Sequence, residues 1–96
     1  MSPKNKKKLN ILRGKLDKID NKLIDIIKVR TNIVKEVVKL KEFKYEIVDK
    51  KRISIILRKI KKKSISKNID PKITNRIWKN MIWSYINYER KFFKKK

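Results

Sequence analysis

The sequence predicts an all-α protein of three helices, and three observations lead to this prediction. Apolar residues recur at alternating four- and three-residue steps over long stretches, which is the spacing of one face of a helix. The 96 residues include only one Gly and two Pro, so few positions can break a helix. No segment shows the alternation of apolar and polar residues that is typical of a half-buried strand.

The first helix is predicted over residues 9–42 and carries a continuous apolar seam. The seam consists of Leu12, Leu16, Ile19, Leu23, Ile26, Ile33, Val37 and Leu40. A helix of this extent is roughly 50 Å long. A chain of 96 residues is too small to cover such a helix alone. We therefore expect the seam to pack against other helices along its whole length, including those of a partner chain.

Two shorter helices follow a connection at residues 43–49. Asp49 is a suitable N-cap for a helix over residues 50–63. Asp70 followed by Pro71 is a strong start signal for a third helix that runs to residue 93. The expected apolar face of the second helix is Ile53, Ile56, Leu57 and Ile60, and that of the third is Ile73, Ile77, Met81, Tyr85, Tyr88 and Phe92. The helical domain thus covers residues 9–93, between basic tails at residues 1–8 and 94–96.

Composition limits the chemistry. The chain has 31 Lys and Arg against 9 Asp and Glu, a net charge of +22, and no His or Cys. Without these two residue types, disulfides, thiolate metal sites and hydrolysis by a histidine base are not expected, and we predict no metal or cofactor. The N-terminus has no apolar core of a secretory signal, and no stretch is long enough to span a membrane, so a cytoplasmic protein is expected.

The excess positive charge has two interpretations. Small, strongly basic chains often bind the phosphates of nucleic acid. The alternative is biased composition, since Lys, Ile and Asn dominate and the lysines are spread along the chain with clusters at its ends. We favour biased composition as the origin of the excess positive charge as a whole, and we do not expect nucleic acid to be the partner.

Arg30 interrupts the apolar seam where the repeat requires a hydrophobic residue. It either extends from the edge of the seam to solvent, pairs with an acid across an interface, or binds an anionic ligand. Lys41 lies three turns further along the same face. Arg13 lies about 25 Å from Arg30 on the same helix. If two copies pack antiparallel about a centre near residue 25, Arg13 of the partner falls between Arg30 and Lys41.

Arg13 and three further residues also have an ordinary structural explanation. Arg13 can form an i,i+4 pair with Asp17. Arg52 can join the cation cluster or remain a surface residue, and Glu89 can pair with a neighbouring Lys or Arg. The aromatic residues of the third helix, Tyr85 among them, are more typical of a core than of a ligand cage.

The string LRGKLDKIDNKLIDIIKVR at residues 12–30 resembles the all-α chorismate mutase class. The resemblance rests on the Leu-Arg pair, two apolar-Asp pairs at fixed steps, and apolar positions leading to an Arg. The order and spacing continue to Lys41, to Arg52 and to the Asp-Pro helix start, so the resemblance covers residues 9–93. It implies an intertwined, antiparallel homodimer of three-helix chains, each active site being shared between the chains.

The resemblance also implies roles for individual residues. Arg13 of the partner chain and Arg30 would bind substrate carboxylates. Lys41 and Glu89 would hydrogen-bond to the ether oxygen of the bond that breaks. Arg52 would help to hold the substrate side chain or a neighbouring loop, and Asp49 would lie near the substrate hydroxyl. Tyr85 is a further substrate-binding position.

Two departures bear on the substrate. Ile53 stands where many family members have a Glu that binds the substrate hydroxyl, and Tyr85 replaces a small hydroxyl residue. These features are similar to the isochorismate-pyruvate lyase branch. Conversion of chorismate to prephenate is the function that we expect, with the lyase reaction on isochorismate as the first alternative and a non-enzymatic nucleic-acid-binding protein as the second.

Overall fold

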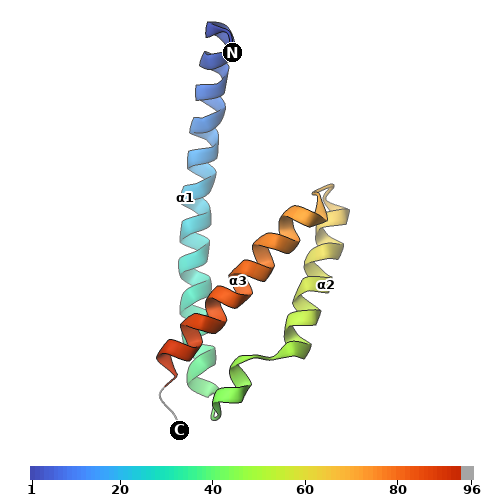
Figure 1. The fold of residues 1–96 in the computed structure, drawn as a ribbon. Helices are drawn as coiled ribbons and strands as arrows, with labels where there is room; N and C mark the ends of the chain where they lie inside the picture. The colour runs from blue at the N-terminus through green and yellow to red at the C-terminus, as the bar shows by residue number, and fades with distance from the viewer. Residues whose placement is uncertain (94–96) are drawn as a thin grey trace. The chain divides into compact units, whose positions relative to one another are not determined.

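The structure, a computed structural model, describes residues 1–93 and shows helices and no strand in that part of the chain. The elements are α1 (Pro3–Leu40), η1 (Lys44–Ile47), α2 (Lys50–Ser66) and α3 (Pro71–Phe92) (Figure 1). The prediction of an all-α chain with three helices and a long first helix is confirmed. The basic tail predicted at residues 94–96 lies outside the described residues.

Helix α1 begins six residues earlier than predicted, because the sequence Ser2-Pro3 forms a helix start. The hydroxyl of Ser2 accepts a hydrogen bond from the backbone N–H of Asn5, and its carbonyl accepts one from Lys6. Pro3 occupies the first helical position, where its missing N–H costs nothing. Most of the basic segment at residues 1–8 is therefore helical.

The end of α1 comes two residues earlier than predicted, because Glu46 competes for the next backbone donors. Its carboxylate accepts hydrogen bonds from the N–H groups of Glu42 at 2.7 Å and Phe43 at 3.1 Å. A continuing helix would direct these N–H groups to carbonyls of the preceding turn. Glu46 thus turns the chain out of α1 and into η1.

Helices α2 and α3 form a hairpin with well-defined ends. Asp49 caps α2 by accepting from the N–H of Arg52, and Asp70 caps α3 by accepting from the N–H of Lys72, as predicted. Helix α2 runs three residues beyond its predicted end. Asn68 follows it with a φ of 57°, the left-handed conformation of a Schellman C-cap, and the N–H of Ile69 donates to the carbonyl of Ser64.

The core of the C-terminal part lies where α3 meets η1 and α2. Ile47, Ile82 and Ile86 are buried, and Ile53, Ile56 and Leu57 of α2 pack against them. The predicted apolar face of α2 is thus confirmed for these three residues. The predicted face of α3 was wrong in register, because its buried positions are Ile82, Ile86 and Glu89. Of the six residues predicted for that face, Ile73, Ile77 and Phe92 are exposed.

Contacts divide the chain into two units, Met1–Ile33 and Val34–Lys96. No residue of the first unit is buried. The seam residues within it are between 49% and 61% exposed. None of the helices described in residues 1–93 has an apolar stretch long enough to cross a membrane.

Candidate functional site

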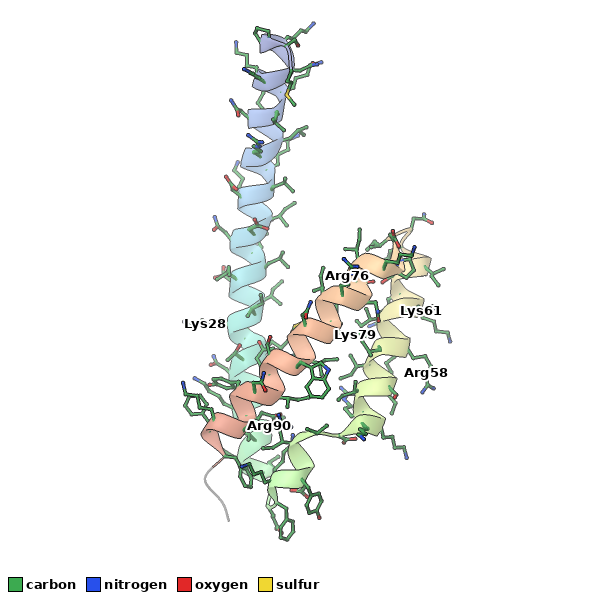
Figure 2. The ribbon with its side chains drawn as sticks, in the orientation of Figure 1. Lys28, Arg58, Lys61, Arg76, Lys79 and Arg90 are labelled. Atoms are coloured by element: carbon green, nitrogen blue, oxygen red, sulfur yellow. The ribbon has the colours of Figure 1, made fainter. Side chains whose placement is uncertain are left out.

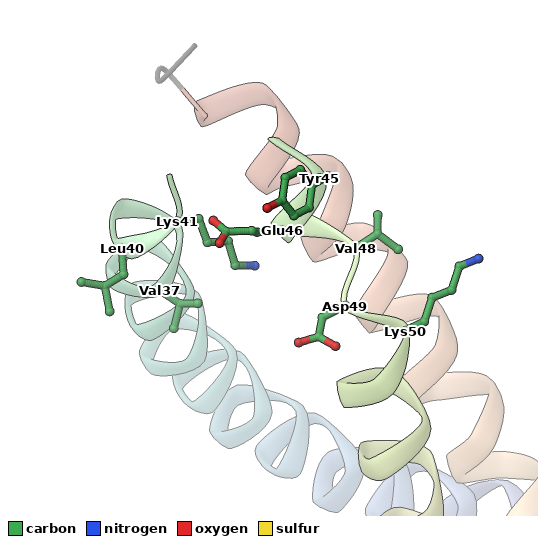
Figure 3. Close-up of a pocket in the computed structure, with 8 residues that line it drawn as sticks. All are labelled: Val37, Leu40, Lys41, Tyr45, Glu46, Val48, Asp49 and Lys50. Atoms are coloured by element: carbon green, nitrogen blue, oxygen red, sulfur yellow. The ribbon is translucent and has the colours of Figure 1, made fainter. Parts of the chain in front are cut away.

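An open pocket lies where the end of α1, η1 and the start of α2 meet, within the C-terminal unit. Its volume is about 710 Å³. Val37, Leu40 and Val48 supply apolar wall, and the polar lining residues are Lys41, Tyr45, Glu46, Asp49 and Lys50 (Figure 3). A cation and carboxylates on a partly apolar wall can hold and orient a small polar molecule.

Lys41 is positioned by an ion pair with α3. Its ammonium donates to Oε1 of Glu89 at 3.0 Å, and the two side chains are 19% and 8% exposed. The residues are 48 positions apart in the chain, so the fold brings them together. Glu89 is buried beside Ile86 on the inner face of α3. An ammonium has three donors, and Glu89 occupies one of them, which fixes Lys41 while leaving donors for a ligand.

The ion pair is one of the two explanations that the sequence allowed for Glu89. In the structure Glu89 accepts a hydrogen bond from Lys41. A role as a hydrogen-bond donor to a ligand requires its protonated form.

Asp49 and Arg52 are joined through the N-terminus of α2. One carboxylate oxygen of Asp49 accepts the backbone N–H of Arg52 at 2.9 Å and caps the helix. The same side chain lines the pocket together with Lys41, so Asp49 has a structural role whether or not it binds a ligand. Arg52 itself is exposed, in the first turn of α2.

The remaining predicted site residues lie on α1 and α3. Tyr85 is half-buried on α3, one turn before Glu89. Arg13 and Arg30 belong to the Met1–Ile33 unit, where Arg13 is exposed and Arg30 is half-buried. The ion pair between Arg13 and Asp17 that the sequence allowed is not among the ion pairs of residues 1–93. The meeting of Arg13 or Arg30 with Lys41 remains a prediction.

Three polar residues of the pocket were not predicted from the sequence. Glu46 follows Phe43 by three residues, which is the spacing of the acid in a capping box, but Phe43 lacks the side-chain oxygen of that motif, so the spacing is only a partial signal. Tyr45 and Lys50 had no such signal, because a short connection does not reveal which side chains face a pocket. Figure 3 shows Lys50 directed away from Lys41 and Asp49.

No group of acidic residues among residues 1–93 is arranged to hold a metal ion. The polar lining of the pocket consists of Lys41, which Glu89 holds in place, together with Lys50, Tyr45, Glu46 and Asp49.

Comparison with known protein families gives a match to chorismate mutase type II over residues 12–90. The matched region includes most of α1, all of α2, most of α3 and every site residue discussed above. No curated protein and no solved structure matches the chain. Because the family match covers far more than half of the sequence, the chain belongs to the chorismate mutase type II family, and its activity is of the chorismate mutase type.

Proposed function

We propose that the protein converts chorismate to prephenate, a step of phenylalanine and tyrosine biosynthesis. The observation that carries this proposal is the partly buried Lys41–Glu89 pair beside an open pocket, in a chain that matches the family from residue 12 to residue 90. The pair presents an oriented ammonium donor, which is what an ether oxygen that gains negative charge requires.

The reaction suits this residue set. Chorismate rearranges in one pericyclic step, in which the ether C–O bond breaks while a C–C bond forms. All electrons stay within the substrate, and no proton is transferred. The enzyme has to hold a dianion in its reactive conformer and stabilise charge on the ether oxygen. Arg and Lys side chains perform both tasks, so the lack of His and Cys is no disadvantage.

In the proposed mechanism Lys41 donates to the ether oxygen with an N–H that Glu89 does not occupy. Glu89 donates to the same oxygen once its carboxyl is neutral. Activity is therefore expected to fall as pH rises.

The other predicted residues bind the rest of the substrate. Arg30 and the partner's Arg13 are proposed to bind its two carboxylates, since a guanidinium matches a carboxylate with two parallel hydrogen bonds. Arg52 and Tyr85 are proposed to hold the side chain and ring. Asp49 has one carboxylate oxygen engaged by its helix cap and is proposed to reach the substrate hydroxyl with the other.

We also propose that the active enzyme is an intertwined, antiparallel homodimer. This is supported by the first unit, in which no residue is buried and the seam residues are at least 49% exposed. A lone helix with such a seam is unstable in water and gains its stability from packing. A second copy of the same seam is complementary to it, and two-fold pairing places Arg13 near the partner's Arg30 and Lys41.

One structural observation favours the lyase alternative. Ile53, at the position where many relatives have Glu, packs against the buried cluster of Ile47, Ile82 and Ile86. Its side chain therefore belongs to the core and offers no acceptor to a substrate hydroxyl. The same cations could then expel pyruvate from isochorismate, in which the hydroxyl occupies a different carbon.

The proposal is tested by offering purified protein chorismate and isochorismate separately and identifying the products. We expect loss of the chorismate diene absorbance with formation of prephenate. Lys41→Gln keeps the first methylene groups of the side chain but removes its positive charge, and this variant should abolish the reaction. Salicylate and pyruvate from isochorismate, with chorismate unchanged, would establish the lyase instead. No reaction with either substrate would contradict both.

A further inference from the structure

A second feature of the molecule is the charge of the α2–α3 hairpin. Residues 50–93 contain fourteen Lys and Arg and two acids, Asp70 and Glu89. Glu89 is buried against Lys41, and Asp70 accepts the backbone N–H of Lys72 as a helix cap. Asp70 is thus the one exposed acid of this segment, against fourteen cations. The exposed side of this hairpin is therefore almost purely basic.

Some of these cations gather around a groove between α2 and α3. The groove has a volume of about 370 Å³. Arg58 and Lys61 line it from α2, and Lys72 and Asn75 line it from the first turns of α3. All three cations are exposed, and none has an ion pair with any residue among 1–93.

The basic surface continues along α3 and ends at an aromatic side chain. Lys72, Arg76, Lys79 and Trp83 follow one another at steps of four, three and four residues, so they share one face of the helix. Trp83 is 48% exposed, whereas Ile82 and Ile86 on the adjoining face are buried in the core. Figure 2 shows Arg58 and Lys61 on α2 and Arg76 and Lys79 on α3.

This combination fits a phosphate-rich strand with unpaired bases. Single-stranded nucleic acid binds in basic grooves that follow its backbone, with bases stacked on aromatic side chains. A duplex keeps its bases stacked inside and could use only the cations. A small dianion would need no row of cations that extends along a helix. We propose that the groove and the basic face of α3 bind single-stranded nucleic acid, with phosphates at Arg58, Lys61 and Lys72 and a base on Trp83.

From the sequence, in which the cations are spread along the chain, we did not expect nucleic acid to be a partner. Folding places residues from two helices around one groove, and this arrangement is not visible in the order of the sequence. The surface does not include Lys41 or Glu89, so it does not depend on the proposed enzymatic function.

The test is the binding of a fluorescent oligothymidylate to the full chain, followed by anisotropy over a series of salt concentrations. The groove variant is Arg58→Gln/Lys61→Gln/Lys72→Gln. Loss of three phosphate contacts should weaken binding about tenfold or more and reduce the slope of log K against log salt by about 2. The matched control, Lys18→Gln/Lys22→Gln/Lys28→Gln, removes the same charge from α1 and should change the slope by less than about 1. Equal effects of the two variants would overturn the proposal.

A second variant tests the stacking contact. Trp83→Leu should weaken binding of the single strand by about fivefold or more and leave binding of the matching duplex unchanged. Equal weakening of both nucleic acids, or binding to phosphatidylglycerol vesicles without binding to the oligonucleotide, would contradict the proposal. The substituted cations are exposed, so the groove variant should keep the circular dichroism and the chorismate turnover of the unchanged protein. If it unfolds, Arg76→Gln/Lys79→Gln provides the same test.

Discussion

At the residue scale the central feature is the contact between Lys41 and Glu89. The sequence singled out both residues, but their meeting depends on the packing of α3 beside the end of α1. Burial makes the contact specific, because a buried charge without a partner is costly. Each residue therefore holds the other in place, and a substitution at either position affects both.

Glu89→Gln separates the two roles of this carboxyl. Gln keeps an oxygen that accepts from Lys41 and adds a donor that does not depend on pH. If Glu89 acts as a neutral donor, activity of the unchanged enzyme falls as pH rises, while the variant keeps a flat profile. The measurement is kcat/KM for chorismate over a series of pH values. A profile that is already flat in the unchanged enzyme would rule out the donor role.

Arg30→Leu tests why the seam is interrupted. A Leu restores the apolar repeat, so we expect the free energy of unfolding to be unchanged or higher. The rearrangement should be abolished, since one carboxylate of the dianion loses its guanidinium. Urea unfolding and turnover are measured on the same preparation, with Lys28→Leu on the same helix as the control. Full activity in Arg30→Leu would show that Arg30 has only a structural role.

At the scale of elements, capping residues in the sequence predicted the starts of α2 and α3. The helix ends that were predicted wrongly have local causes. Asp49 and Asp70-Pro71 were recognised as helix starts, whereas Ser2-Pro3 was not, because it lies in a basic segment that was interpreted as a tail. The face of α3 was misjudged because apolar residues surround most of that helix. Only the position of η1 and α2 decides which of them is buried.

Asn68 provides a test of the turn between α2 and α3. Its φ of 57° is easy for Gly, acceptable for Asn and costly for a β-branched residue. Asn68→Val should lower the free energy of unfolding by about 1–2 kcal/mol, and Asn68→Gly should not. Urea unfolding of both variants at one protein concentration provides the comparison. An equal loss in both would mean that the Asn side chain, rather than the backbone conformation, stabilises the turn.

At the scale of the whole molecule, the exposed seam of α1 makes a partner chain part of the proposed active site. Arg13→Gln and Lys41→Gln are each expected to be inactive as homodimers. Mixed after denaturation and refolding, they should regain about a quarter of full activity, since half of the dimers are mixed and each holds one intact site. Chorismate turnover of the mixture measures this. If the chains exchange and activity does not recover, both residues belong to a site formed by one chain.

The sequence by itself determined the all-α class, the long first helix, the capped starts of α2 and α3 and the family, because these depend on periodicity, caps and spacing within one segment. The tertiary structure decided which face of α3 is buried and the pairing of Lys41 with Glu89. It also gathered Arg58, Lys61 and Lys72 around one groove. These features join residues distant in the chain, and their formation depends on how whole helices pack, which no local pattern specifies.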